Sequence, residues 1–143
     1  IVERILKRLR PIAQKQNIEL VFETFRTVEA EVDETKLSLA VSNLVENAIK
    51  YNHKNGWVHV SLNADHKFFY LKVADSGMGI PKESQEHIFE RFYRVDKSHS
   101  KEVGGTGLGL SIVKHAVKLL GGDVSLESEE NKGTSVTVTL PKI

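Results

Sequence analysis

The chain carries, from residue 43, the stretch Asn43-Leu44-Val45-Glu46-Asn47-Ala48-Ile49-Lys50-Tyr51. Two glycine-rich stretches follow it, Asp75-Ser76-Gly77-Met78-Gly79 and Gly104-Gly105-Thr106-Gly107-Leu108-Gly109-Leu110. Each part supplies one property that a nucleotide site needs. Amide oxygens suit a hard cation, a carboxylate reads the edge of a base, and backbone without side chains approaches phosphates closely. The three parts in this order predict an ATP site.

The first stretch is the second half of an expected helix. Asp33 is a good N-cap, and Glu34 follows it in the first turn, where the helix dipole favours an acidic residue. The apolar face of this helix comprises Leu37, Val41, Leu44, Val45 and Ala48. Asn43, Asn47 and Lys50 cluster within about 60° on a different, polar face. We expect both amides to reach one phosphate cluster, with Asn47 as the Mg²⁺ ligand and Lys50 adding positive charge.

The two glycine stretches have different expected roles. Asp75 directly follows a strand, so its carboxylate is placed to accept from an exocyclic amino group such as N6 of adenine, and Gly77 and Gly79 let the backbone approach the ring. The second stretch opens a helix, whose free N–H groups and dipole attract phosphate. Residues 76–107 between strand and helix are expected to form a lid. Within them Arg94 is best placed to contact phosphate, anchored by Phe92-Tyr93.

Other glycine-loop classes fail on spacing. A Walker loop needs Lys after its second glycine, but Leu110 follows Gly109. The dinucleotide and protein-kinase loops need G-x-G-x-x-G, and Leu110 stands at the last position counted from Gly105. Taken singly, Asn-x-x-x-Asn is most often a solvated helix face and Asp-Ser-Gly a simple turn, so the prediction rests on their combination.

Bulk properties limit the function classes. The 143 residues suit one domain, and 20 basic against 19 acidic residues give no drive toward nucleic acid. There is no cysteine, which fits a reducing compartment, and no apolar run approaches a membrane span. The sole methionine is Met78, so we expect a fragment of a longer protein, cytoplasmic and monomeric by itself.

Residue patterns predict an α+β organisation. Helices are expected from residue 1 to Pro11, from Asp33 to about Tyr51 and over 107–120, with a further helical turn near 88–92. Strands are expected at 18–22, 58–62, 69–73, 124–126 and 136–140. Their alternation is typical of an antiparallel or mixed sheet covered by helices on one side.

Five sequence boxes resemble those of bacterial sensor histidine kinases. Residues 43–51 resemble the N box of that family, and 75–80 resemble its first glycine box. The F box is matched by Ile88-Phe89-Glu90-Arg91-Phe92-Tyr93-Arg94, and the second glycine box by 105–110. Lys132-Gly133-Thr134 resembles the final glycine element. The match spans roughly residues 18 to 141 with every box in order.

The resemblance implies the Bergerat-type ATP-binding fold that DNA gyrase, mismatch-repair and heat-shock chaperone ATPases share. This fold is a two-layer α/β sandwich, with a mixed, mostly antiparallel sheet covered on one face by three helices. It implies Mg²⁺ on Asn47, adenine read by Asp75 and supported by the Thr134 hydroxyl, and a mobile lid. The expected nucleotide-contacting residues are Asn43, Asn47, Lys50, Tyr51, Asp75, Gly77, Met78, Gly79, Ile80, Phe92, Tyr93, Arg94, Thr106, Gly107, Leu108, Gly109, Leu110 and Thr134. Asn47 and Arg94 are the expected catalytic residues.

The implied activity is transfer of the ATP γ-phosphoryl group to a histidine on a separate dimerisation domain, with a response regulator acting downstream. None of the six histidines lies in the family's phosphoacceptor context, so we expect the acceptor upstream of Ile1. Residues 1–16 are then the end of the linker or dimerisation helix, and 17–143 the ATP-binding domain. The whole protein is expected to be a membrane-anchored sensor.

Three alternatives remain open. A stand-alone ATPase of the gyrase or chaperone type needs a glutamate one turn before the metal-binding asparagine, and Asn43 occupies that position. A nucleotide-sensing module without catalysis would bind ATP but transfer nothing. A serine-directed relative is a further possibility, although the segment 92–97 is more similar to the histidine kinases.

Overall fold

The computed structural model describes residues 2–24, 33–90 and 109–141. The helices in these ranges are α1 (Val2–Lys15), α2 (Glu34–Lys50) and α4 (Gly109–Leu119), with the short 3₁₀ helix η1 (Lys82–Ser84). The strands are β1 (Glu19–Thr24), β2 (Trp57–Ala64), β3 (Phe68–Asp75), β4 (Asp123–Glu129) and β5 (Gly133–Pro141).

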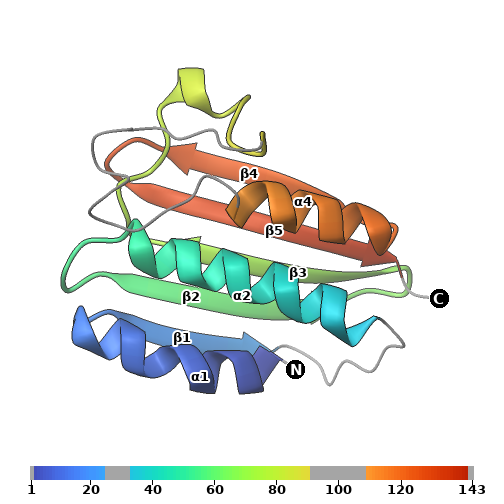
Figure 1. Cartoon of the computed structure of the whole chain (residues 1–143), viewed down its shortest axis with the longest axis horizontal. Coiled ribbons are helices and arrows are strands. Elements are labelled where there is room, and N and C mark those ends of the chain that lie inside the picture. The colour runs from blue at the N-terminus through green and yellow to red at the C-terminus, as the bar shows by residue number, and fades with distance from the viewer. Residues whose placement is uncertain (1, 25–32, 91–108, 142–143) are drawn as a thin grey trace.

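The strands form one five-stranded sheet in the order β1-β2-β3-β5-β4. Only β1 and β2 run parallel, and the other three neighbouring pairs are antiparallel. Figure 1 shows α1, α2 and α4 side by side on one face of this sheet, with α2 in the middle. The predicted two-layer sandwich with a mixed, mostly antiparallel sheet is therefore confirmed.

The core lies between the helices and the covered face of the sheet. On α2 the buried residues recur at helical spacing, and Val41 and Val45 are fully buried. On β2 the burial alternates, so that Val58 and Val60 face the helices while Trp57 and His59 face away. Burial of these apolar faces holds the helices on the sheet and fixes the sheet register, since a one-residue slip would turn every core side chain outward.

Helix α1 extends further than the sequence predicts. It continues through Pro11 to Lys15, although Pro11 has no N–H for the helical hydrogen bond. Ala13 is fully buried beyond the proline, and this packing holds the last turn in place. Arg8 of α1 also donates to the Ser42 hydroxyl of α2 at 2.7 Å. Residues 2–15 thus share one core with the rest of the chain, and their expected link to a dimerisation helix stays a prediction.

The caps and turns decide where the other elements end. Asp33 caps α2 as predicted, because its carboxylate accepts from the backbone N–H of Lys36 at 3.1 Å. Helix η1, at Lys82–Ser84, precedes the helical turn predicted near 88–92, which stays a prediction because the structure describes that stretch only as far as Glu90. Residues 91 and 92 lie outside the described ranges.

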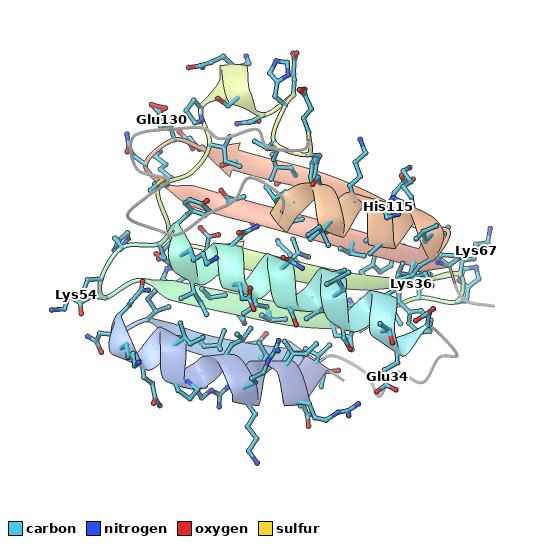
Figure 2. All side chains as sticks on the ribbon, in the orientation of Figure 1. Glu34, Lys36, Lys54, Lys67, His115 and Glu130 are labelled. Carbon is cyan, nitrogen blue, oxygen red and sulfur yellow. The ribbon has the colours of Figure 1, made fainter. Side chains whose placement is uncertain are left out.

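One end of the molecule gathers the segments that carry the expected site. Figure 2 shows Lys54, in the α2–β2 turn, and Glu130, in the β4–β5 turn, at the same end of the sandwich. Glu34 at the start of α2 and Lys67 in the β2–β3 turn lie at the other end. Because β3 is antiparallel to β2, Asp75 at its C-terminus also lies at the first end. No helix among the described residues is long and apolar enough to cross a bilayer.

Candidate nucleotide-binding site

Asp75 is a half-buried carboxylate at the last position of β3. The backbone N–H of Gly77 donates to its Oδ1 at 2.8 Å. Burial raises the pKa of Asp75 to about 6, although the backbone N–H groups of Gly77 and Thr134 favour the charged form and work against this rise. At neutral pH the group is therefore an ionised acceptor whose charge is poorly solvated. Such a group gains by accepting a hydrogen bond from a ligand.

The loop after Asp75 passes so close to other backbone at two positions that only glycine fits there. A Cβ on Gly77 would lie 2.6 Å from the carbonyl oxygen of Tyr51 and 2.9 Å from Asp75 Oδ1. Gly79 has a φ of +70°, and a Cβ there would lie 2.1 Å from the carbonyl oxygen of Glu129. The two glycines thus let the loop fit between the end of α2 and the β4–β5 turn.

Backbone hydrogen bonds fix this loop on both sides. Met78 donates from its N–H to the carbonyl of Tyr51 at 3.0 Å, and its own carbonyl accepts from Asn131 N–H at 2.7 Å. The Met78 side chain is 41% exposed, which leaves it available to a ligand. The structure therefore brings together four of the expected residues, Tyr51, Asp75, Gly77 and Met78.

Asn47 lies on the flank of α2 that faces away from α1. Ser42 marks the α1 side of α2 by its contact with Arg8, and Asn47 is about 140° further round the helix. Because α2 lies between α1 and α4 (Figure 1), Asn47 is on the α4 flank. Its side-chain amide is half-buried and has no hydrogen-bond partner within the described ranges. A half-buried side-chain amide at this position fits a ligand role.

Asn43 is differently engaged. Its Nδ2 donates to the carbonyl of Leu39 in its own helix at 2.8 Å, which leaves the side-chain oxygen for another partner. Lys50 is exposed. Among the residues described, no cluster of three His, Cys, Asp or Glu side chains is placed to hold a metal ion. The donor set therefore fits Mg²⁺ held by an amide together with ligand phosphates, and does not fit a carboxylate cage.

Several expected contacts lie outside the described residues. These are Phe92, Tyr93, Arg94, Thr106, Gly107 and Leu108. Gly109 is the first residue of α4, and Leu110 after it packs partly buried against the core. The expected contacts of the second glycine stretch with phosphate therefore stay a prediction.

Thr134 and two residues that the sequence analysis missed connect the loop to β4. The Thr134 hydroxyl lies 2.8 Å from Ser128 Oγ, and the Thr134 backbone N–H, after that of Gly77, works against the rise in the pKa of Asp75. Ser128 Oγ accepts from Ile80 N–H at 2.8 Å. Gln85 donates from Nε2 to the carbonyls of Ile80 (2.9 Å) and Ser128 (3.1 Å). No motif marks Ser128 or Gln85; only strand register could have placed Ser128 beside Thr134.

A second missed group ties the loop to the start of β2. The Ser76 hydroxyl accepts from Trp57 N–H at 2.8 Å and donates to Asn52 Oδ1 at 3.2 Å. Asn52 Nδ2 in turn donates to the carbonyl of Trp57 at 2.9 Å. These hydrogen bonds therefore connect the α2–β2 turn, the first residue of β2 and the loop.

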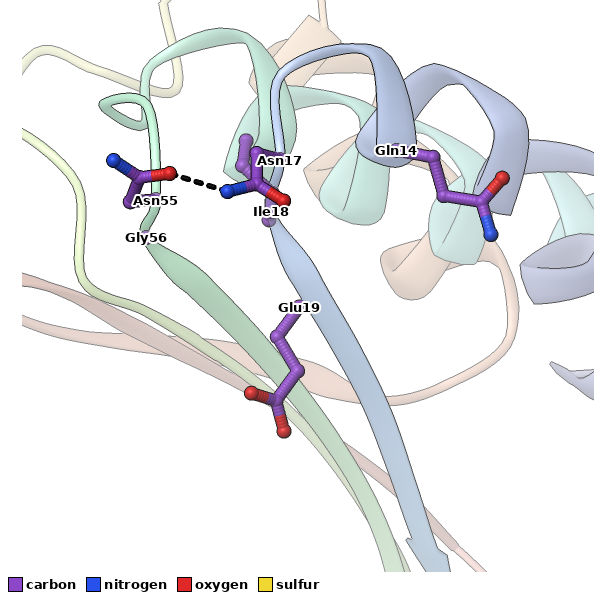
Figure 3. Close-up of a pocket in the computed structure, with 6 residues that line it drawn as sticks. All are labelled: Gln14, Asn17, Ile18, Glu19, Asn55 and Gly56. Atoms are coloured by element: carbon purple, nitrogen blue, oxygen red, sulfur yellow. Dashed lines mark hydrogen bonds between the residues drawn. The ribbon is translucent and has the colours of Figure 1, made fainter.

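A separate depression of about 430 Å³ lies at the same end of the molecule, outside the predicted site. Figure 3 shows its lining residues. The side chain of Asn17, after α1, donates a hydrogen bond to the side chain of Asn55, just before β2. Both asparagines have positive φ, 55° and 69°, which is usual for asparagine in tight turns. The lining residues are Gln14, Asn17, Ile18, Glu19, Asn55 and Gly56. None of them was an expected nucleotide contact.

Comparison with known proteins agrees with this geometry. Residues 32–143 match the model of the histidine kinase-, DNA gyrase B- and HSP90-like ATPase family. The chain belongs to this family. The matched range contains all five sequence boxes that resemble those of the histidine kinases.

Individual relatives point to the histidine kinase branch of this ATPase family. The sensor histidine kinase WalK of Bacillus subtilis is 44% identical over 118 residues, which are 81% of this chain and 19% of WalK. The chain thus spans about a fifth of the length of such relatives. Among solved structures, the catalytic domain of the histidine kinase ThkA has a TM-score of 0.86 at 31% identity, over 99% of this chain and 91% of that domain.

Two further solved structures contain a similar domain within a longer chain. Full-length ShkA, solved in complex with AMPPNP, has a TM-score of 0.84 at 26% identity. The match covers 99% of this chain and 29% of the ShkA chain. ThkA in complex with the response regulator TrrA has a TM-score of 0.81 at 28% identity, over 99% of this chain and 39% of that one. The fold of this ATPase is therefore that of histidine kinase catalytic domains.

Proposed function

We propose that this ATPase domain binds Mg-ATP and donates the γ-phosphoryl group to a histidine on a separate dimerisation domain of the same full-length protein. The observation that carries the proposal is Asp75, an ionised and poorly solvated acceptor beside a loop with glycine at positions 77 and 79. This arrangement suits the exocyclic amine of adenine. The likeness to ShkA, which binds AMPPNP, supports the same ligand class.

Each group in the site has a defined task. Asp75 accepts from the base, and the backbone around Gly77 and Gly79 packs against the ring. Asn47 would hold Mg²⁺, which would supply neutralisation of the phosphate charge. Lys50 adds positive charge near the phosphates. The histidine of the dimerisation domain attacks the γ-phosphorus, and ADP leaves as the bond to its bridging oxygen breaks. Because the transition state is loose, positioning and charge neutralisation are what this domain contributes, and it needs no nucleophile of its own.

The partners follow from the same assignment. The phosphoacceptor histidine belongs to the dimerisation domain, to which residues 1–16 lead. The likeness to ThkA, solved with TrrA, supports a response regulator as the later recipient of the phosphoryl group. Within this scheme the domain works on the cytoplasmic side of a membrane-anchored sensor, and Arg94 contacts the phosphates from the lid.

Calorimetric titration tests the ligand assignment. We expect binding of ATP and ADP that strengthens with Mg²⁺, and weak binding of GTP. Transfer is then tested by adding a purified dimerisation domain and [γ-³²P]ATP and following acid-labile label on that domain. Label on the dimerisation domain supports the proposal. Steady phosphate release without the acceptor would support a stand-alone ATPase, and binding without transfer would support a sensing module.

A further inference from the structure

A row of four side chains crosses the covered face of the sheet at the site. Val58 of β2 pairs with Asp75 of β3, Asp75 pairs with Thr134 of β5, and Thr134 pairs with Ser128 of β4. Directly opposite residues in a sheet point to the same face. Val58 is fully buried beneath the helices, so Asp75, Thr134 and Ser128 face the same side. Thr134 thus lies between the carboxylate expected to read the base and the hydroxyl of Ser128.

The contacts of Ser128 settle the direction of its hydrogen bonds. Its Oγ lies 2.8 Å from Ile80 N, 3.0 Å from the carbonyl oxygen of Gly133 and 2.8 Å from Thr134 Oγ1. The N–H of Ile80 can only donate and the carbonyl of Gly133 can only accept. A hydroxyl has one proton, so Ser128 donates it to Gly133 and accepts from Ile80. The remaining contact requires that the Thr134 hydroxyl donate to Ser128.

This assignment fixes what Thr134 presents to a ligand. With its single proton directed at Ser128, the Thr134 oxygen has only lone pairs left for a neighbouring group. Asp75 beside it is also an acceptor. A purine with a 6-amino group supplies the donor that such acceptors need, whereas the 6-oxo group of hypoxanthine or guanine would bring lone pairs against lone pairs.

We propose that Ser128 is a positioning residue that holds the Thr134 hydroxyl as an acceptor toward the base and so strengthens the preference for 6-aminopurine over 6-oxopurine nucleotides. The inference rests on the proposed nucleotide function. Gln85 supports the arrangement, because its Nε2 donates hydrogen bonds to the carbonyl oxygens of both Ile80 and Ser128. These bonds hold the Ser128 hydroxyl close to its three partners. Without the Ser128 hydroxyl, Thr134 is free to rotate and to donate to a 6-oxo group.

The test compares the affinities of two nucleotides that differ at position 6. Mg-ATP and Mg-ITP are titrated calorimetrically into the wild type, Ser128→Ala and Ser128→Thr. The ratio of the ITP to the ATP dissociation constant is expected to fall about fivefold to tenfold in Ser128→Ala, which corresponds to one hydrogen bond. Ser128→Thr, which keeps the hydroxyl, should restore the wild-type ratio. A merely structural loss would weaken both nucleotides equally and leave the ratio unchanged.

A second variant keeps the inference testable if Ser128→Ala does not fold. Thr134→Val removes the hydroxyl itself and is expected to lower the same ratio, and adding Ser128→Ala to it should lower the ratio no further. An unchanged ratio in either single variant, with ATP still bound, would overturn the role of Ser128. Failure of the wild type to bind ATP at all would instead overturn the proposed function.

Discussion

Tyr51 and Met78 are joined by a backbone hydrogen bond of 3.0 Å, which runs from the N–H of Met78 to the carbonyl of Tyr51. Tyr51 is the C-cap of the helix that carries Asn47, and Met78 lies in the loop that follows Asp75. The expected metal end and the expected base end of the site are therefore held at a fixed separation by the fold itself. A change that disturbs this contact should affect both ends together.

Gly77→Ala is expected to disturb that contact. The added Cβ would lie 2.6 Å from the carbonyl oxygen of Tyr51, so the loop must move away from α2. We expect ATP affinity to fall at least tenfold and the free energy of unfolding to fall by about 1–3 kcal/mol, measured by calorimetry and urea denaturation. Gly121→Ala is the matched control. It is strained by a φ of +80° but meets only ordinary contacts, so it should lower stability without changing ATP affinity.

Asn47→Ala is expected to remove the magnesium dependence of binding. The half-buried amide of Asn47 on the α4 flank is the proposed Mg²⁺ ligand, so its loss should make ATP affinity nearly the same with Mg²⁺ and with EDTA. Phosphoryl transfer to a dimerisation domain should be lost as well. Glu46→Gln is the control, because Glu46 lies about 100° round the helix from Asn47, toward the α1 side. Undiminished magnesium dependence in Asn47→Ala would show that another group holds the cation.

Asp75→Asn is expected to stabilise the ligand-free protein at neutral pH. The folded pKa of about 6 is above the ordinary 3.8, so the folded state binds more protons than the unfolded state between these values. Stability therefore falls as pH rises from about 4 to about 6 and stays lower above, by about 3 kcal/mol at most. Asparagine carries no charge to desolvate. Urea denaturation at pH 4.5 and 7.5 should show an advantage of Asp75→Asn that grows with pH; a difference independent of pH would contradict it.

The sequence predicts some helices, strands and site residues better than others. Helix α2 was predictable because Asp33 caps it and its apolar residues recur at helical spacing. The expected end of the first helix at Pro11 was wrong, because α1 continues to Lys15 and burial of Ala13 outweighs one missing hydrogen bond. The place of Asp75 at the end of β3 was predictable because the alternating apolar residues of the strand stop just before it. Ser128 and Gln85 were not, because their role depends on the pairing of β4 with β5 and on a contact 43 residues apart in the chain.

The affinity for adenine nucleotides should depend on the protonation of Asp75. An ionised Asp75 is a stronger acceptor for the exocyclic amine than the protonated form, so the affinity should be full above about pH 7 and fall as pH drops through about 6. The ATP phosphates titrate nearby, and they do so identically in every variant. The decisive quantity is therefore the difference between the profiles of wild type and Asp75→Asn. We expect the two to converge at pH 5, because a protonated carboxyl and an amide accept similarly. Parallel profiles from pH 5 to 8 would show that Asp75 does not read the base as an anion.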